Sequence, residues 1–131
     1  MPDASAFHHV TLSVTDAEAS AVWYCRALDA EVVARREGDS WRRVLVRSHG
    51  GVVVGLTQHD ATADGDRFEP TRVGLDHLSV ACRDTAEVEA WSEHLAGVGV
   101  SRGEIRWEAY GTTVVAKDPD GIALEFFAST G

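Results

Sequence analysis

Hydrophobic and polar residues alternate along two short segments of the chain. In residues 8–14 the apolar side chains fall on every second position, which is the period of a half-buried strand. Residues 77–82 repeat this alternation, with Leu78, Val80 and Cys82 on the apolar side. Since successive side chains of a strand point to opposite faces, each segment has one face for a core and one polar face. The pattern therefore predicts two equivalent half-buried strands.

A helix is predicted after each of these strands. Residues 17–28 follow Thr15 and Asp16, which are both candidate N-caps, and Glu18 could complete a capping box with Thr15. A second helical segment follows Asp84 and ends at Gly97 or Gly99. Aspartate is favoured at the N-cap because its side chain accepts a hydrogen bond from a free N–H of the first turn, and glycine is favoured just after the last turn. The residues predicted to face the core are Val22, Trp23 and Leu28 in the first helix and Val88, Trp91 and Leu95 in the second.

Three more strand-like runs follow each helix, separated by turn residues. These runs are residues 31–37, 40–48 and 51–59 in the first half and residues 104–110, 112–118 and 122–128 in the second. Each half of the chain is therefore predicted to have the order βαβββ.

The two halves are also related by sequence. A shift of 68 residues carries His9 onto His77, Asp16 onto Asp84 and Trp23 onto Trp91. We expect one domain over residues 1–131, with an α+β fold of two tandem βαβββ modules. The predicted modules span residues 7–60 and 75–128, and the polar residues 61–74 are the predicted linker.

Composition narrows the classes of partner. The formal net charge is −9, so the surface would repel phosphate backbones and we expect no nucleic-acid partner. The two cysteines form no disulfide framework, which favours the reducing cytoplasm. No apolar run approaches the roughly 20 residues of a membrane span, and the N-terminus has no signal-peptide pattern, so we expect a cytoplasmic protein without membrane contact.

The polar faces of the two repeated strands indicate a functional site. Each face begins with a histidine, His9 or His77, and continues with small residues that leave room above the imidazole. In the last predicted strand, Glu125 stands alone among apolar residues, where a carboxylate is costly to bury unless it is paired or bound to metal. Two imidazoles and one carboxylate suit Fe, Mn, Co, Ni or Zn and leave coordination positions open.

With these features the chain resembles the vicinal oxygen chelate superfamily, which includes glyoxalases, extradiol dioxygenases and bleomycin-resistance proteins. The resemblance rests on HHVTLSVTD and WYCRALDA in the first half and on GLDHLSVACRD and KDPDGIALEFFA in the second, and it covers residues 7 to 128. It implies the glyoxalase/bleomycin-resistance/dioxygenase fold, an open barrel of curled sheets. It also implies a homodimer.

The resemblance further implies a set of metal ligands. The family's first-strand ligands correspond to His9 and His77, and its last-strand ligand corresponds to Glu125. The matching position of the first module is Gly55, where many glyoxalases have a second Glu or a Gln, so a centre with three protein ligands and one divalent metal ion is expected. His9 and His77 would reach one metal either within one chain or across two.

The implied function is a metal-dependent enzyme, a lyase or isomerase or a dioxygenase, that binds a small substrate through two adjacent oxygens. The alternative is a metal-free protein of the bleomycin-resistance type that binds and sequesters a small molecule. His59 shares the face of Gly55 and is a candidate catalytic base, a displaced ligand or a rim residue. Tyr110, just before a predicted strand, is a candidate substrate contact.

Overall fold

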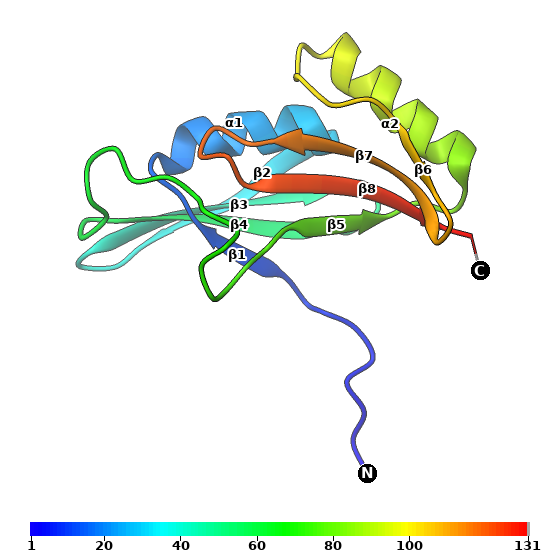
Figure 1. Cartoon of the computed structure of the whole chain (residues 1–131). Coiled ribbons are helices and arrows are strands. Elements are labelled where there is room, and N and C mark those ends of the chain that lie inside the picture. Colours follow the sequence, from blue (N-terminus) through cyan, green and yellow to red (C-terminus); the bar gives the residue numbers. More distant parts are fainter. Residues whose placement is uncertain (131) are drawn as a thin grey trace. The chain divides into compact units, whose positions relative to one another are not determined.

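The computed structural model describes residues 1–130 and divides into two compact units, Met1–Asp66 and a second unit that begins at Arg67. Each unit contains one helix and one four-stranded sheet (Figure 1). In the first unit the chain before β1 extends away from the sheet.

The first unit has the order βαβββ. Its elements are β1 (Val10–Ser13), α1 (Ala17–Leu28), β2 (Ala30–Glu37), β3 (Trp41–Ser48) and β4 (Val53–His59). The strands lie in the order β1-β4-β3-β2, with β1 parallel to β4 and the other pairs antiparallel. The parallel pair brings the first and last strands of the unit together at the edge of the sheet.

The second unit repeats this order. Its elements are β5 (Leu78–Ala81), α2 (Thr85–Gly97), β6 (Arg106–Glu108), β7 (Gly111–Lys117) and β8 (Ala123–Ser129). The strands lie in the order β5-β8-β7-β6, again with the first and last strands parallel. The predicted α+β fold of two βαβββ modules is therefore confirmed, and each sheet is open at its two edge strands. The strand predicted over residues 104–110 is shorter, because its pairing with β7 covers only Arg106–Glu108.

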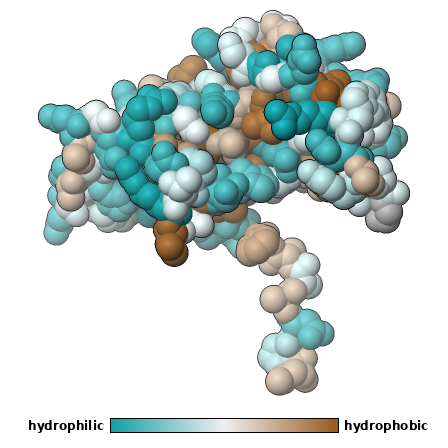
Figure 2. Space-filling model, in the orientation of Figure 1, coloured by the Kyte–Doolittle hydropathy of each residue, from teal (hydrophilic) through white to brown (hydrophobic). Residues whose placement is uncertain are grey.

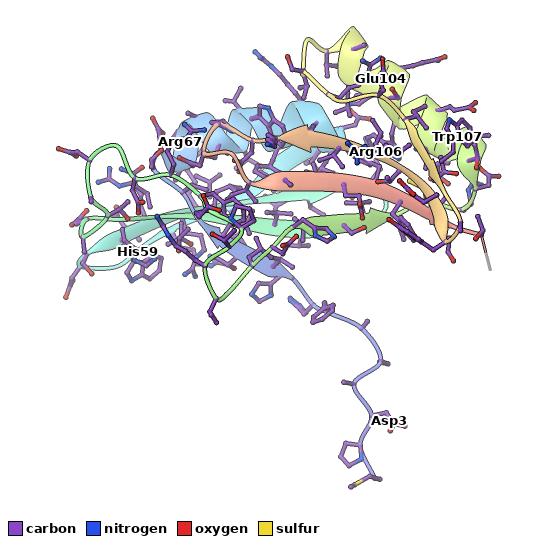
Figure 3. The ribbon with its side chains drawn as sticks, in the orientation of Figure 1. Asp3, His59, Arg67, Glu104, Arg106 and Trp107 are labelled. Atoms are coloured by element: carbon purple, nitrogen blue, oxygen red, sulfur yellow. The ribbon has the colours of Figure 1, made fainter. Side chains whose placement is uncertain are left out.

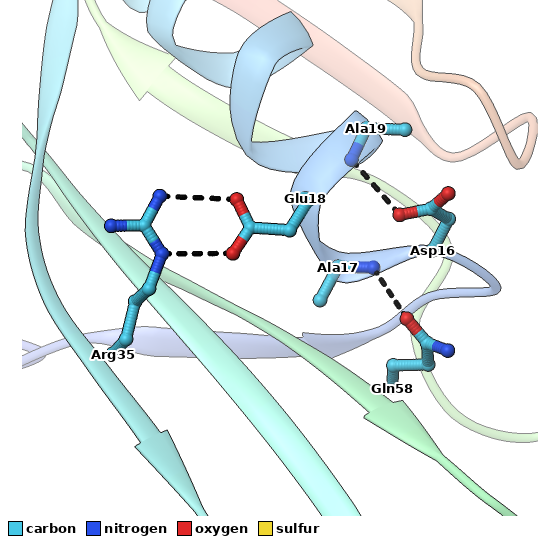
Figure 4. Close-up of polar contacts among 6 residues, drawn as sticks. All are labelled: Asp16, Ala17, Glu18, Ala19, Arg35 and Gln58. Atoms are coloured by element: carbon cyan, nitrogen blue, oxygen red, sulfur yellow. Dashed lines mark hydrogen bonds and ion pairs between the residues drawn. The ribbon is translucent and has the colours of Figure 1, made fainter.

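Helix α1 begins where the sequence predicts, and three contacts hold its first turn (Figure 4). Asp16 is the N-cap, and its carboxylate accepts a hydrogen bond from the backbone N–H of Ala19 at 3.0 Å. The N–H of Ala17 donates to the side-chain carbonyl of Gln58 on β4, also at 3.0 Å. Glu18 receives two hydrogen bonds from Arg35 on β2. The helix start is thus tied to two strands of its own sheet.

The buried side of α1 differs from the prediction. Val22 is 52% exposed, whereas Tyr24 and Ala27 are completely buried. The buried positions recur every three or four residues, as on one face of a helix, and Val22 lies outside that series. They are Ala17, Ser20, Ala21, Tyr24, Ala27 and Leu28.

Helix α2 packs on its sheet as predicted. Val88 and Leu95 are completely buried, and the ring of Trp91 stacks on Phe126 of β8 with centroids 4.7 Å apart. The opposite side of the helix is polar, and hydrophilic residues cover most of the face of the molecule drawn in Figure 2. None of the helices among residues 1–130 has the length and hydrophobicity needed to span a membrane.

Candidate metal centre

His77 and Glu125 meet on the second sheet. His77 immediately precedes β5, and Glu125 lies on β8, the parallel neighbour of β5. The Nε2 atom of His77 is 3.7 Å from Oε1 of Glu125. Metal–ligand bonds to nitrogen and oxygen are about 2.0–2.2 Å long, so two donors separated by less than about 4 Å can share one cation. This pair therefore fits two of the three predicted ligands.

Two neighbouring side chains fix the orientation of this pair. The Nδ1 atom of His77 lies 2.8 Å from the carboxylate of Asp76. Because a carboxylate can only accept, the Nδ1–H donates to Asp76 and the lone pair is left on Nε2, the atom nearest Glu125. The hydroxyl of Ser79 donates to Oε1 of Glu125 at 2.8 Å. A carboxylate behind a histidine is the usual arrangement at metal sites, because it fixes the tautomer and the ring.

The alternation of β8 explains why Glu125 is available. Leu124 and Phe126 are completely buried against the helix side, whereas Glu125 lies on the opposite face with its side chain 20% exposed. A carboxylate at this depth needs partners, and Ser79 and His77 supply them. Arg43, a strand arginine that could have neutralised such a carboxylate, donates instead to Thr57 of its own unit.

Gly55 holds the equivalent position in the first sheet. In the register of the parallel pairs, Thr11 lies opposite Gly55 and Ser79 lies opposite Glu125. The alignment that matched Gly55 with Glu125 is thus confirmed by backbone pairing. A Cβ atom on Gly55 would lie 3.0 Å from Oγ1 and 3.2 Å from Cγ2 of Thr11. The side chain of Thr11 would therefore have to shift by a few tenths of an ångström to admit any side chain at this position.

His9 lies in the first unit, one residue before β1, as His77 lies one residue before β5. The two histidines thus hold equivalent places in their modules. His9 is exposed, and its Nδ1 atom is 2.8 Å from Nδ1 of the adjacent His8. The polar face that follows His9 in β1 is open, since Thr11 and Ser13 are exposed while Leu12 between them is buried.

His59, labelled in Figure 3, is the last residue of β4, and the parallel pairing of β1 with β4 puts it at the opposite end of that strand from His9. It lies four positions after Gly55, which is about 13 Å along an extended strand. Its cross-strand partner is Trp41, and it is exposed. This separation favours a rim position for His59 over a ligand position at Gly55.

A cavity of about 800 Å³ in the second unit includes Glu125 in its wall. Tyr110, the predicted substrate contact, lines the same cavity and stacks on Phe127, with ring centroids 6.1 Å apart. Glu104 and Arg106 contribute from the segment between α2 and β7 (Figure 3). The other lining residues are Ser101, Arg102, Gly103, Ile105, Glu108, Thr113, Val115 and Lys117.

Several residues of this site were not singled out from the sequence. Asp76 precedes His77 in a loop, where an aspartate is usually only a turn residue. Lys117 and Thr113 were assigned to a strand without a role, although β7 directs both to the face of Glu125. The buried hydroxyl of Thr113 has no hydrogen-bond partner among residues 1–130. The period of β7 could have placed these two residues on the polar face, but their closeness to Glu125 depends on strand register.

The two cysteines have no place in this site. Cys82 is buried and free, and the pKa of its thiol is raised from 9.0 to about 11, mainly by burial and in part by the nearby carboxylate of Glu87. Burial also raises the pKa of the Cys25 thiol. A thiol that keeps its proton at neutral pH is a poor ligand and a poor nucleophile.

Among residues 1–130, no three histidine, cysteine, aspartate or glutamate side chains gather in a cluster suited to a metal ion. The pair His77–Glu125 lies within one unit, and His9 belongs to the other. The donor types of the pair nevertheless suit a first-row divalent cation.

Comparison with known proteins identifies the family. Residues 6–126 match the model of the Glyoxalase/Bleomycin resistance protein/Dioxygenase superfamily, and the chain belongs to this superfamily. The predicted family is therefore confirmed. No curated protein matches the sequence.

Solved structures of the family have the same fold. A glyoxylase/bleomycin resistance protein/dioxygenase domain from Frankia sp. EAN1pec is 31% identical, with a TM-score of 0.86 over 97% of this chain and 93% of that chain. Two more distant structures show the fold alone. The fosfomycin resistance protein FosX from Listeria monocytogenes is 18% identical (TM-score 0.70; 98% and 96% covered). The lactoylglutathione lyase from Agrobacterium tumefaciens is 21% identical (TM-score 0.68; 97% and 96% covered).

Proposed function

We propose that this protein is a metal-dependent enzyme that binds a small substrate through two adjacent oxygens. His9, His77 and Glu125 would hold one divalent cation, of Fe, Mn, Co, Ni or Zn. The observation that carries the proposal is the array in which Asp76 directs the lone pair of His77 toward Glu125. In the same family, one FosX structure from Listeria monocytogenes is a complex with Mn(II) and 1S,2S-dihydroxypropylphosphonic acid.

The residues of the second unit have distinct roles in this proposal. Asp76 accepts a hydrogen bond from the Nδ1–H of His77, and the hydroxyl of Ser79 donates one to Oε1 of Glu125. A bound divalent cation would supply Lewis acidity for stabilising a developing enolate or oxyanion. Tyr110 would contact the substrate from the wall of the cavity. These groups are placed before the substrate arrives, which lowers the cost of organising the site.

Gly55 limits the kind of chemistry. A second carboxylate at this position would be a fourth ligand or a base, and glycine provides neither. Three protein ligands leave coordination positions for the two substrate oxygens and a further small molecule, which suits a lyase, an isomerase or a dioxygenase. His59 remains a candidate base acting from the rim of the first sheet. We further propose that the protein is a cytoplasmic homodimer without nucleic-acid or membrane partners.

A second candidate function is metal-free binding of a small molecule. The stacked rings of Tyr110 and Phe127 stand beside a cavity large enough for a drug-sized ligand, and such a pair suits a planar aromatic compound. This function would need neither His77 nor Glu125 as a ligand. The two candidates therefore predict opposite effects of a His77 substitution.

An activity screen tests the first candidate. Protein without a histidine tag would be assayed with each of the five cations, on hemithioacetals for isomerisation and on catechols for dioxygen uptake. The proposal predicts one cation-dependent activity that His77→Ala abolishes and that the control His49→Ala retains, since His49 is a highly exposed turn residue. A protein that binds a planar aromatic compound equally well with and without His77, and that shows no cation-dependent turnover, would be the sequestration protein instead.

A further inference from the structure

Arg43 of β3 is held in place by two contacts on the polar face of the first sheet. Its Nε–H donates to the hydroxyl of Thr57 on β4 at 2.7 Å. Its guanidinium lies over the ring of Trp41, 4.6 Å from the centroid. Thr57 is only 1% exposed, and Arg43 is half-buried. An arginine restrained at both its Nε atom and its face loses little further entropy when it binds a ligand.

The ring under Arg43 is itself fixed. A Cβ atom on Gly38 would lie 2.3 Å from Nε1 of Trp41, so the indole packs directly against the backbone of the β2–β3 turn. The N–H of Gly38 also donates to the carbonyl of Trp41 at 2.9 Å. Only a residue without a side chain leaves room for the indole in this position. Trp41 is thus a rigid support for the guanidinium.

Arg43 also borders Gly55, the position equivalent to Glu125 of the second sheet. Its Cδ atom would be 3.5 Å from a Cβ on Gly55. In the second sheet the equivalent position carries the carboxylate of Glu125. The first sheet therefore presents a cation beside the position where the second sheet presents an anion.

The charge of Arg43 is not neutralised by the protein. Its two terminal NH₂ groups make no hydrogen bond or ion pair within residues 1–130. Directly opposite on β2 lies Arg36, which likewise has no carboxylate partner in that part of the chain. Like charges in directly opposed positions of a sheet are destabilising. The chain has 21 acidic and 12 basic residues, so two adjacent unpaired arginines are unexpected unless an anion binds them.

We propose that Arg43, with Arg36 beside it, binds the anionic group of a small-molecule ligand. The NH₂ groups of Arg43 form a fork that matches the two oxygens of a carboxylate or phosphate. The exposed part of Trp41 would contact the adjoining portion of the ligand. This inference rests on the proposed function and specifies it: the substrate carries a carboxylate or phosphate group in addition to its two adjacent oxygens.

Titration with simple oxyanions tests the proposal. The protein, labelled with ¹⁵N, would be titrated with malonate and with inorganic phosphate while the arginine Nε–H signals are followed by NMR. The Arg43 signal, identified by its loss in Arg43→Gln, is expected to shift and saturate. Malonate binding tighter than phosphate binding assigns a carboxylate, and the reverse assigns a phosphate. If neither anion shifts the Arg43 signal of the wild-type protein, the proposal is wrong.

Variants separate this role from a structural one. Arg43→Gln should weaken oxyanion binding at least about tenfold, and Arg43→Lys should give an intermediate loss, because lysine keeps the charge without the fork. The control Arg42→Gln removes the same charge from the opposite face of β3 and should leave affinity unchanged. Equal affinities in Arg43→Gln and Arg42→Gln would refute the assignment.

The same titration in His77→Ala distinguishes this inference from the proposed function. Arg43 and His77 lie in different units, and the oxyanion contact needs no cation. His77→Ala should therefore keep the affinity for the oxyanion and lose its metal. An Arg43→Gln variant should show the reverse, with its metal content retained. Loss of oxyanion binding in His77→Ala would contradict the assignment to Arg43.

Discussion

Gly55 and Glu125 occupy the same position in two sheets of identical topology. Each lies opposite the second residue of a parallel neighbour, Thr11 for Gly55 and Ser79 for Glu125. In one unit the position carries a carboxylate bound by a hydroxyl group, and in the other it carries glycine, bordered by the side chain of Thr11 and the stem of Arg43. The two units thus have the same backbone pairing at this position, but a carboxylate stands there in one unit and an arginine side chain lies beside it in the other.

Asp76 is expected to control metal affinity without being a ligand. Asp76→Ala removes the acceptor at Nδ1 of His77, so the ring and its tautomer are no longer fixed. Metal affinity should fall about 10- to 100-fold, the usual effect of losing such a partner. Competition with a metal-binding dye measures the change, and Asp64→Ala, in the first unit, is the control. An affinity unchanged in Asp76→Ala would mean that Nδ1 needs no carboxylate.

Gly111 should tolerate no side chain. A Cβ atom there would lie 2.5 Å from the carbonyl oxygen of Ala128 and 2.6 Å from the ring of Phe127. Gly111→Ala must displace backbone or a ring of the cavity wall, which costs about 1–3 kcal/mol of unfolding free energy. Gly97→Ala is the control, since nothing lies within 4 Å of its Cβ position at the end of α2. Urea unfolding of both variants checks the difference, and equal midpoints would show that the strand can shift at no cost.

Asp118 is expected to hold the β7–β8 turn together. Its buried carboxylate accepts hydrogen bonds from the N–H groups of Asp120 and Ile122, at 2.9 and 2.8 Å. Asp118→Ala leaves these donors without that partner, and each unsatisfied buried group costs about 1–3 kcal/mol. Asp118→Asn keeps an acceptor oxygen and should lose less stability. Thermal unfolding of the two variants would contradict the account if asparagine were as destabilising as alanine.

The thiol of Cys82 should resist alkylation until the pH is high. Its pKa is raised to about 11, so at pH 8 the thiolate is about a hundredfold scarcer than in an unfolded chain with a pKa of 9.0. Burial slows the reaction further. Iodoacetamide labelling at pH 8, read by mass spectrometry with and without urea, measures the protection. Equal rates in the two conditions would show that the thiol is accessible in the folded protein.

The same shift makes the fold less stable in alkali. The folded chain keeps the Cys82 proton to a higher pH than the unfolded chain does, so the unfolded state binds fewer protons between pH 9 and pH 11. This contribution to stability is complete below pH 9 and is lost as the pH rises through about 11. Cys82→Ala should remove this part of the pH dependence, as seen by urea unfolding at several pH values. If Cys82→Ala shows the same pH dependence of stability as the wild type, groups other than Cys82 cause the loss of stability in alkali.

Local patterns predicted most of the architecture. The bounds of α1 and the Asp84 cap of α2 follow from side-chain chemistry within a few residues, which left Thr15 and Asp16 as alternative caps of α1. The alternation in β8 placed Glu125 on the face opposite to that of Leu124 and Phe126. The burial of α1 was predicted less well. Val22 is apolar but lies outside the buried series, so its exposure depends on where the sheet lies rather than on its hydrophobicity.

The contacts of the candidate site were less predictable, because they join residues far apart in the sequence. Ser79 and Glu125 are 46 residues apart and meet only through the register of a parallel pair. Arg43 and Thr57 depend in the same way on the pairing of β3 with β4. The repeat identified the histidines and the glutamate as candidates, but it carried no signal for the hydroxyl and guanidinium groups around them.

Metal content measures the central claim most directly. Protein purified without a histidine tag would be analysed for Fe, Mn, Co, Ni and Zn, alongside His77→Ala, Glu125→Ala and the control His49→Ala. The account predicts about one ion per chain in the wild type and in His49→Ala, and loss of the ion in the other two variants. A wild-type protein that takes up none of these ions, even after incubation with each, or variants that retain the ion fully, would contradict it.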